Sequence, residues 1–144
     1  MSKKEILIKE LLLDLSLDLE QYGILLDFLT RQNSLLKLRN TKELFKLNSN
    51  LLPLIENLNK RADRREKNLL LLGVEKNNSG MIRIFNILPN NIKHRALDDW
   101  KNLHDIILDC RTKNIDNGRI LAQQRSIFEK LIDPEKEFLY KPNE

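Results

Sequence analysis

The segment KNIDNGRILAQQ (113–124) places two amides and a glycine within five positions of a pattern that is otherwise helical. Asn114, Asn117 and Gly118 occupy positions where an apolar stripe would present leucine. A buried amide without a partner costs about 1–3 kcal/mol, and glycine inside a helix costs about 0.5–1 kcal/mol relative to alanine. Costs of this size indicate that the three residues have a structural or functional role.

Three interpretations of these residues are open. Asn117-Gly118 is a turn signal that would end the helix, although the apolar period continues through residues 120–131 without a phase jump. The amides would otherwise pair with each other, or with Asn33, and fix the register of two helices. In the third interpretation they line a groove, where amides bond a partner and glycine permits close approach. The residues support the second and third interpretations equally.

Side chains that support catalysis or metal binding do not form a recognisable motif. The two histidines, His94 and His104, are ten positions apart on different faces of one predicted helix. Asp105 and Asp109 share a face, but two carboxylates make a poor metal site. Cys110 is the single cysteine, which excludes an internal disulfide. We therefore expect no enzyme activity, no cofactor and no bound metal.

The densest basic stretch is NKRADRREK (59–67). Asp63 and Glu66 dilute its charge, and no aromatic side chains interleave with it for base stacking. The stretch is therefore predicted to be a solvated helix face, and no nucleic-acid partner is expected.

Composition favours long helices in one domain. The chain has 144 residues, only four glycines and four prolines, and 25 Lys+Arg against 21 Asp+Glu, for a formal charge of +4. Acidic residues at 5, 10, 14 and 18 interrupt the apolar N-terminal segment before it reaches the length of a signal sequence or a membrane span. A cytoplasmic protein without membrane insertion is expected.

Residues 3–39 are predicted to form one helix with apolar stripes on two nearly opposite faces. Such a helix is either the middle layer of a bundle or a helix that awaits a partner. The first stripe is Ile8, Leu12, Leu15, Leu19, Tyr22, Leu26, Leu29, Asn33 and Leu36. The second stripe is Ile6, Leu13, Leu17, Ile24, Phe28 and Leu35.

Capping signals divide the remaining chain. The sequence NTKE (40–43) is a capping box that begins a second long helix. Pro53 predicts a kink or a short break within it, and Gly73 predicts a left-handed cap at its end. Ser79 is expected to cap a short helix that Pro89 closes.

A third long helix is predicted to begin after Pro89 and to stop at Pro134. Its stripe is Ala96, Trp100, Leu103, Ile107, Cys110, Asn114, Asn117, Leu121, Gln124, Phe128 and Leu131. The predicted fold is all-α, an elongated antiparallel bundle of three long helices and one short helix over residues 1–132. Residues 133–144 are predicted to be a flexible C-terminal tail.

The segment LDDWKNLHDIILDCRTKNIDNGRILAQQRSIFEKL (97–131) resembles the C-terminal helix of the FlgN family. Members of this family are cytoplasmic export chaperones for the hook–filament junction proteins of bacterial flagella. The resemblance rests on Trp100 followed by Leu103, on the pattern N..NG.L at residues 114–121, and on Leu139-Tyr140. The order and spacing of the predicted helices also agree with the family.

The resemblance implies a chaperone that binds the amphipathic terminal helices of hook–filament junction proteins (FlgK/FlgL-like) and delivers them to the flagellar export gate. Leu139 and Tyr140 are similar to the family's docking element for that gate. The expected client-binding residues provide apolar contact, polar register or close approach, and the apolar ones are equally well explained as core. These residues are Leu121, Phe128 and Leu131 for contact, Asn114 and Asn117 for register, and Gly118 for approach.

The alternative function is a structural coiled-coil protein that self-associates through the second stripe. In that case Ile24 and Phe28 would be buried between copies, and the client-free chain would be a homo-oligomer.

Overall fold

The computed structural model describes residues 1–132, with side chains as far as residue 126. Over these residues the chain forms four helices, namely α1 (Lys3–Lys37), α2 (Thr41–Leu71), α3 (Asn78–Asn86) and α4 (Asn90–Ile132). The predicted all-α fold with three long helices and one short helix is confirmed. Pro134 and the predicted tail over residues 133–144 lie outside the described residues. Within residues 1–132, no helix combines the length and the apolar character needed to cross a bilayer.

The predicted ends of α2 are confirmed. The side chain of Asn40 accepts a hydrogen bond from the backbone N–H of Glu43 at 3.2 Å, which caps the first turn. Gly73 has a φ of 79°, the left-handed conformation that a glycine adopts without strain. The Val74 N–H then donates to the Leu69 carbonyl at 3.1 Å, which satisfies a carbonyl at the end of the helix.

Two local predictions need correction. Of the two alternatives predicted at Pro53, the short break is wrong, because α2 runs continuously through the proline. Leu51, Leu54 and Leu58 on both sides of it are buried in one cluster with α1 residues. The packing of this face offsets the backbone hydrogen bond that proline removes. Asn77 caps α3 in place of Ser79, and its side chain accepts from the Gly80 N–H at 3.2 Å.

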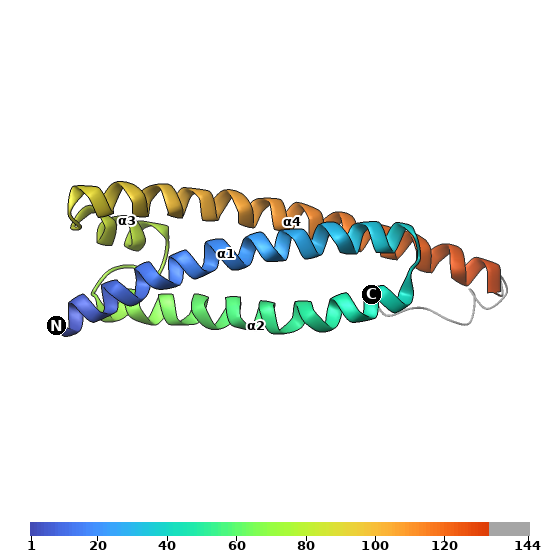
Figure 1. Ribbon diagram of the computed structural model, residues 1–144, viewed down its shortest axis with the longest axis horizontal. Coiled ribbons are helices and arrows are strands. Elements are labelled where there is room, and N and C mark those ends of the chain that lie inside the picture. The colour runs from blue at the N-terminus through green and yellow to red at the C-terminus, as the bar shows by residue number, and fades with distance from the viewer. Residues whose placement is uncertain (133–144) are drawn as a thin grey trace.

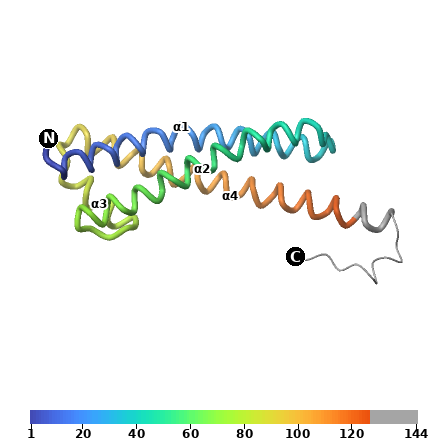
Figure 2. The backbone as a smooth tube through the Cα atoms, turned by 90° about the horizontal axis from the view of Figure 1, so that it is seen from below, coloured from blue at the N-terminus to red at the C-terminus, as the bar shows by residue number. Residues whose placement is uncertain are grey.

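α1 lies between α2 and α4 (Figure 1). The side-chain contacts between α1 and α4 join residues that are 88 positions apart at three successive places, so these two helices are parallel. α2 runs antiparallel to both of them, which gives the predicted antiparallel bundle (Figure 1). Seen from the second direction, α1 and α3 lie on opposite sides of the bundle (Figure 2).

The buried side chains form two clusters along the bundle. We call the first the closed half, because α3 covers it, and all of its members are 3% exposed or less. The second, the open half, has no contribution from α3, and its members are 5–8% exposed. The closed half contains Leu11, Leu15, Leu69, Met81, Ile84, Phe85, Ala96 and Leu103. The open half contains Leu25, Leu29, Leu51, Leu54, Leu58 and Cys110.

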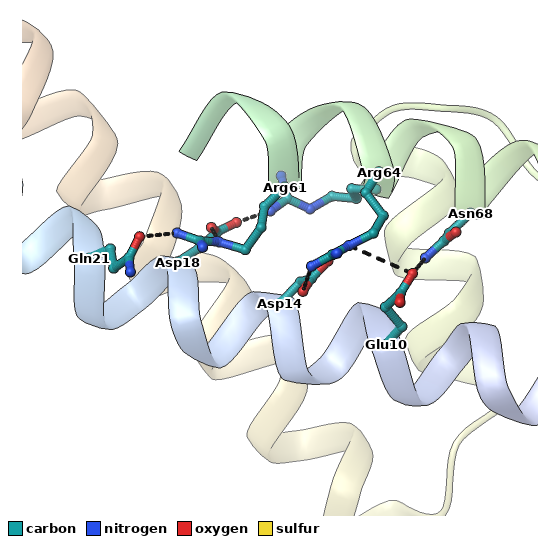
Figure 3. Close-up of polar contacts among 8 residues, drawn as sticks. Glu10, Asp14, Asp18, Gln21, Arg61, Arg64 and Asn68 are labelled. Atoms are coloured by element: carbon teal, nitrogen blue, oxygen red, sulfur yellow. Dashed lines mark hydrogen bonds and ion pairs between the residues drawn. The ribbon is translucent and has the colours of Figure 1, made fainter. Parts of the chain in front are cut away.

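A charged layer joins α1 to α2 (Figure 3). The Asp14 carboxylate accepts two hydrogen bonds from Arg64, at 2.6 and 2.8 Å. The Asp18 carboxylate accepts from Arg61 Nε at 2.5 Å and from Arg65. Because both aspartates are 2% exposed, their charges depend on these arginines for compensation.

The sequence predicted that the basic stretch 59–67 is a solvated helix face. This prediction is incomplete. Three of its arginines are paired across the α1–α2 interface with carboxylates that recur at four-residue spacing on α1. The same layer continues to Asn68, which donates to Glu10 at 2.7 Å. Paired charges at fixed positions favour one register of α2 against α1.

Candidate partner groove

Asn117 forms a buried hydrogen-bond network within the protein. Its Nδ2 donates to the Leu29 carbonyl at 2.9 Å and to Gln32 Oε1 at 2.8 Å. Its Oδ1 accepts from Asn33 Nδ2 at 2.9 Å. The pairing with Asn33 confirms the interpretation in which an amide fixes the register of two helices.

The other two residues of the motif lie on exposed parts of α4. The helix continues through Gly118, so the turn interpretation is wrong. Asn114 and Gly118 are exposed, and a Cβ added to Gly118 would meet no atom within 4 Å. The expectation that all three residues share a buried stripe is therefore wrong. Gly118 points about 100° away from Asn117, and Asn114 lines the cavity beside the α1–α4 seam, whereas Asn117 lies within that seam.

The remaining predicted client-binding residues divide between exposed and undescribed positions. Leu121 is 47% exposed. The side chains of Phe128 and Leu131 lie outside the described residues, and so do Leu139 and Tyr140. Of the six predicted client-binding residues, the structure thus describes four, of which one is buried in an internal network.

A ladder of seven-residue steps joins α4 to α1, and sequence reasoning did not find it. Cys110 Sγ lies 3.6 Å from the Tyr22 carbonyl and donates to it, and Gln124 Nε2 donates to the Leu36 carbonyl at 2.5 Å. Asn117 makes the corresponding bond to Leu29, midway between them. Both helices carry this heptad spacing in the printed sequence, and the matching spacing was the available signal for their pairing.

α2 and α4 scarcely touch each other, so an open trough lies between them with α1 as its floor. At one end of this trough, residues of α3 pack against all three long helices. Two cavities of about 550 and 340 Å³ extend the trough from α3 onward, and Ile107 lines both of them. We call them together the α2–α4 groove.

The walls of the groove come from all four helices. α1 contributes Tyr22, Leu25, Leu29 and Gln32, and α2 contributes Leu51, Ile55, Leu58, Asn59 and Arg65. α3 contributes Asn78 and Ile82 at the closed end, and α4 contributes Leu97, Trp100, Lys101, Leu103, His104, Ile107, Cys110, Arg111 and Asn114. From Leu97 to Asn114 the α4 wall is about 26 Å long, the length of a helix of about 17 residues.

Trp100 and Arg65 form the wall of the groove next to α3. The Trp100 Nε1 donates to Asn78 Oδ1 at 2.7 Å, and the Trp100 ring packs edge-on against Phe85 with 6.3 Å between centroids. The Arg65 guanidinium lies over the Trp100 ring, 5.4 Å from its centroid. These contacts fix a large aromatic side chain at the junction between α3 and the open part of the groove.

The groove has a thiol but no activated nucleophile. Burial raises the pKa of the Cys110 thiol from its ordinary value of 9.0 to about 11, and Asp109 adds to the effect. The thiol is therefore protonated at neutral pH, which is the unreactive form. Within the described residues, no group of three or more potential ligands could hold a metal ion. The site described here can bind an apolar or amphipathic ligand.

The comparisons with known proteins add no relative. No family model matches the chain, and no curated protein or solved structure matches it either.

Proposed function

We propose that this protein binds an amphipathic helix of a partner protein in the α2–α4 groove. The observation that carries the proposal is the position of α3. This amphipathic helix already occupies one end of the trough between α2 and α4, and the rest of the trough has the same apolar floor without a helix over it. A partner helix would lie in the trough beyond α3 and would be the fourth helix of a four-helix bundle there.

The partner proposed is a hook–filament junction protein, and the protein would serve as a cytoplasmic export chaperone for it. The support for this step is the resemblance of residues 97–140 to the FlgN family. A chaperone of this kind covers the terminal helices of its client, prevents their premature assembly and delivers the client to the export gate. Leu139 and Tyr140 are the proposed contact with that gate.

The groove changes which residues are proposed to contact the client. Asn114 lines its far end and stays in the proposed site. Asn117 stabilises the bundle from within and supports the groove indirectly. Leu121 is exposed beyond the groove and would extend the contact if the client helix is longer than about 17 residues.

Co-expression with hook–filament junction proteins, followed by light scattering of the purified complex, tests this proposal. We expect a stoichiometric complex that is lost when the client's terminal helix is deleted. Asn59→Trp, at an exposed position that lines the groove, should block the complex by filling the groove. Asn57→Trp, two residues away, is exposed and absent from the lining, and should leave the complex intact. Equal binding by both variants would contradict the groove as the binding site.

A second candidate function has one specific observation in its favour. Ile6, Leu13, Leu17 and Ile24 of the second stripe are exposed on α1. An apolar stripe at helical spacing is a surface through which two copies could associate as a coiled coil. A protein that sediments as a stable oligomer, and that Leu13→Lys converts to a monomer, would favour this function over client binding.

A further inference from the structure

The charges of the groove walls are all of one sign. Arg65, Lys101 and Arg111 line the two cavities, and no aspartate or glutamate does. This is not a consequence of overall composition, because the whole chain carries only a small positive excess of +4. α4 has acidic residues beside this wall, at 105 and 109, but these side chains are not part of the lining.

The positive charge is concentrated next to α3. Two of the three Lys and Arg side chains, Arg65 and Lys101, line the cavity at that end, and Arg111 lines the cavity at the far end. Arg65 donates one N–H to Asp18, a carboxylate that also accepts from Arg61, so two arginines share one buried negative charge beside this wall.

We infer that the α2–α4 groove is selective for an acidic amphipathic helix of a partner protein, with Asp or Glu side chains flanking its apolar stripe. This inference rests on the proposed function and adds the charge of the client segment to it. The apolar floor at Leu25, Leu29 and Leu58 takes the stripe of the partner helix. The carboxylates on both sides of that stripe then meet Lys101 and Arg111 on α4 and Arg65 on α2.

The basic residues discriminate among amphipathic helices that have equal apolar surface. A helix flanked by lysines would place like charges against the groove wall, which disfavours the complex. A helix flanked by glutamines would keep the apolar contact and lose the charge complementarity. Because Lys101 and Arg111 are exposed, salt should weaken the preference.

Three labelled 17-residue peptides test the inference by fluorescence anisotropy with the full-length chain. They share one leucine stripe and carry Glu, Gln or Lys at the flanking positions. We expect the Glu peptide to bind at least about tenfold more tightly than the Gln peptide at 50 mM salt, with the Lys peptide weakest. At 300 mM salt the difference between the Glu and Gln peptides should shrink severalfold.

A charge-reversed double variant makes the test specific to the groove. Lys101→Glu with Arg111→Glu should invert the order, so that the Lys peptide binds most tightly. Lys113→Glu with Arg119→Glu makes the same change of charge on α4 outside the groove lining, and should keep the original order. Inversion by the control pair as well would overturn the assignment of selectivity to the groove.

The possible failures separate the two proposals. Equal affinity for the Glu, Gln and Lys peptides, with Asn59→Trp abolishing all binding, would overturn the charge selectivity and leave the helix-binding groove in place. Absence of binding by every peptide and by the client would overturn the helix-binding function, and the charge selectivity with it.

Discussion

The closed and open halves of the bundle are built from the same three long helices, yet they differ in how completely their cores are buried. In the closed half, Phe85 and Met81 of α3 are fully buried between α1, α2 and α4. In the open half the floor residues are sealed less completely, and a groove remains above them. The difference shows that one nine-residue helix decides where the core of this bundle is covered and where a groove stays open above it.

The contacts between α1 and α4 change from apolar to polar from the closed half to the open half. In the closed half α4 presents Ala96 and Leu103 to α1, whereas the later heptad positions are Cys110, Asn117 and Gln124. Apolar contact stabilises the first part, and hydrogen bonds to backbone carbonyls define the register of the second. Stability is thus concentrated at the end that α3 covers.

Of the substitutions that test the difference between the two halves, Phe85→Ala is expected to have the largest effect on stability. Phe85→Ala removes a fully buried ring from the closed half and should lower the free energy of unfolding by about 3–5 kcal/mol. Phe45→Ala is the matched control, because Phe45 is 75% exposed and its loss should cost less than about 0.5 kcal/mol. Urea denaturation measures both, and similar losses would contradict the assignment of the closed half as the main core.

Asp18→Asn tests the charged layer between α1 and α2. Removal of this carboxylate leaves Arg61, which is buried, without its compensating charge. We expect a loss of about 3 kcal/mol in the free energy of unfolding. Asp27→Asn, at an exposed position of the same helix, should change it by less than about 0.5 kcal/mol. A small loss in Asp18→Asn would mean that water or other groups satisfy Arg61.

Asn117→Ala tests the register network of the open half. The variant leaves the Leu29 carbonyl and the Asn33 side chain without their partner, so we expect a loss of about 1–3 kcal/mol. Asn114→Ala should be nearly neutral, because Asn114 is exposed. Thermal unfolding of the two variants compares them directly, and the reverse order of stability would contradict the network.

Alanine substitutions of two glycines, one in each half, also test the difference between the halves. Gly118→Ala has the smallest expected effect on stability. Gly118→Ala should stabilise the protein by about 0.5–1 kcal/mol, because α4 is exposed there and a Cβ meets no atom within 4 Å. Gly80→Ala, in the closed half, would place a Cβ 1.7 Å from the Glu75 carbonyl oxygen and should destabilise the fold. Calorimetry gives both melting temperatures, and a lower value for Gly118→Ala would show that another backbone approaches this position.

Local signals in the sequence predicted the helices well and the site only in part. The capping residue Asn40, the left-handed Gly73, the first stripe of α1 and the α4 stripe from Ala96 to Cys110 are as expected, because hydrogen bonds within a few residues and the helical period determine them. The pairing of Asn117 with Asn33 was one of two equal interpretations. The groove was expected mainly on α4, whereas α1 and α2 form its floor and opposite wall.

What the sequence by itself determined is the set of helices, both ends of α2 and most of the rows of apolar residues. Only the tertiary structure decided that α1 and α4 are parallel, that the basic stretch of α2 is paired across an interface, and that Asn114 and Asn117 differ in burial. The physical reason is that a helical stripe specifies a face but not the neighbour of that face. The short length of α3 then decides how much of the common trough is filled and how much stays open to a partner.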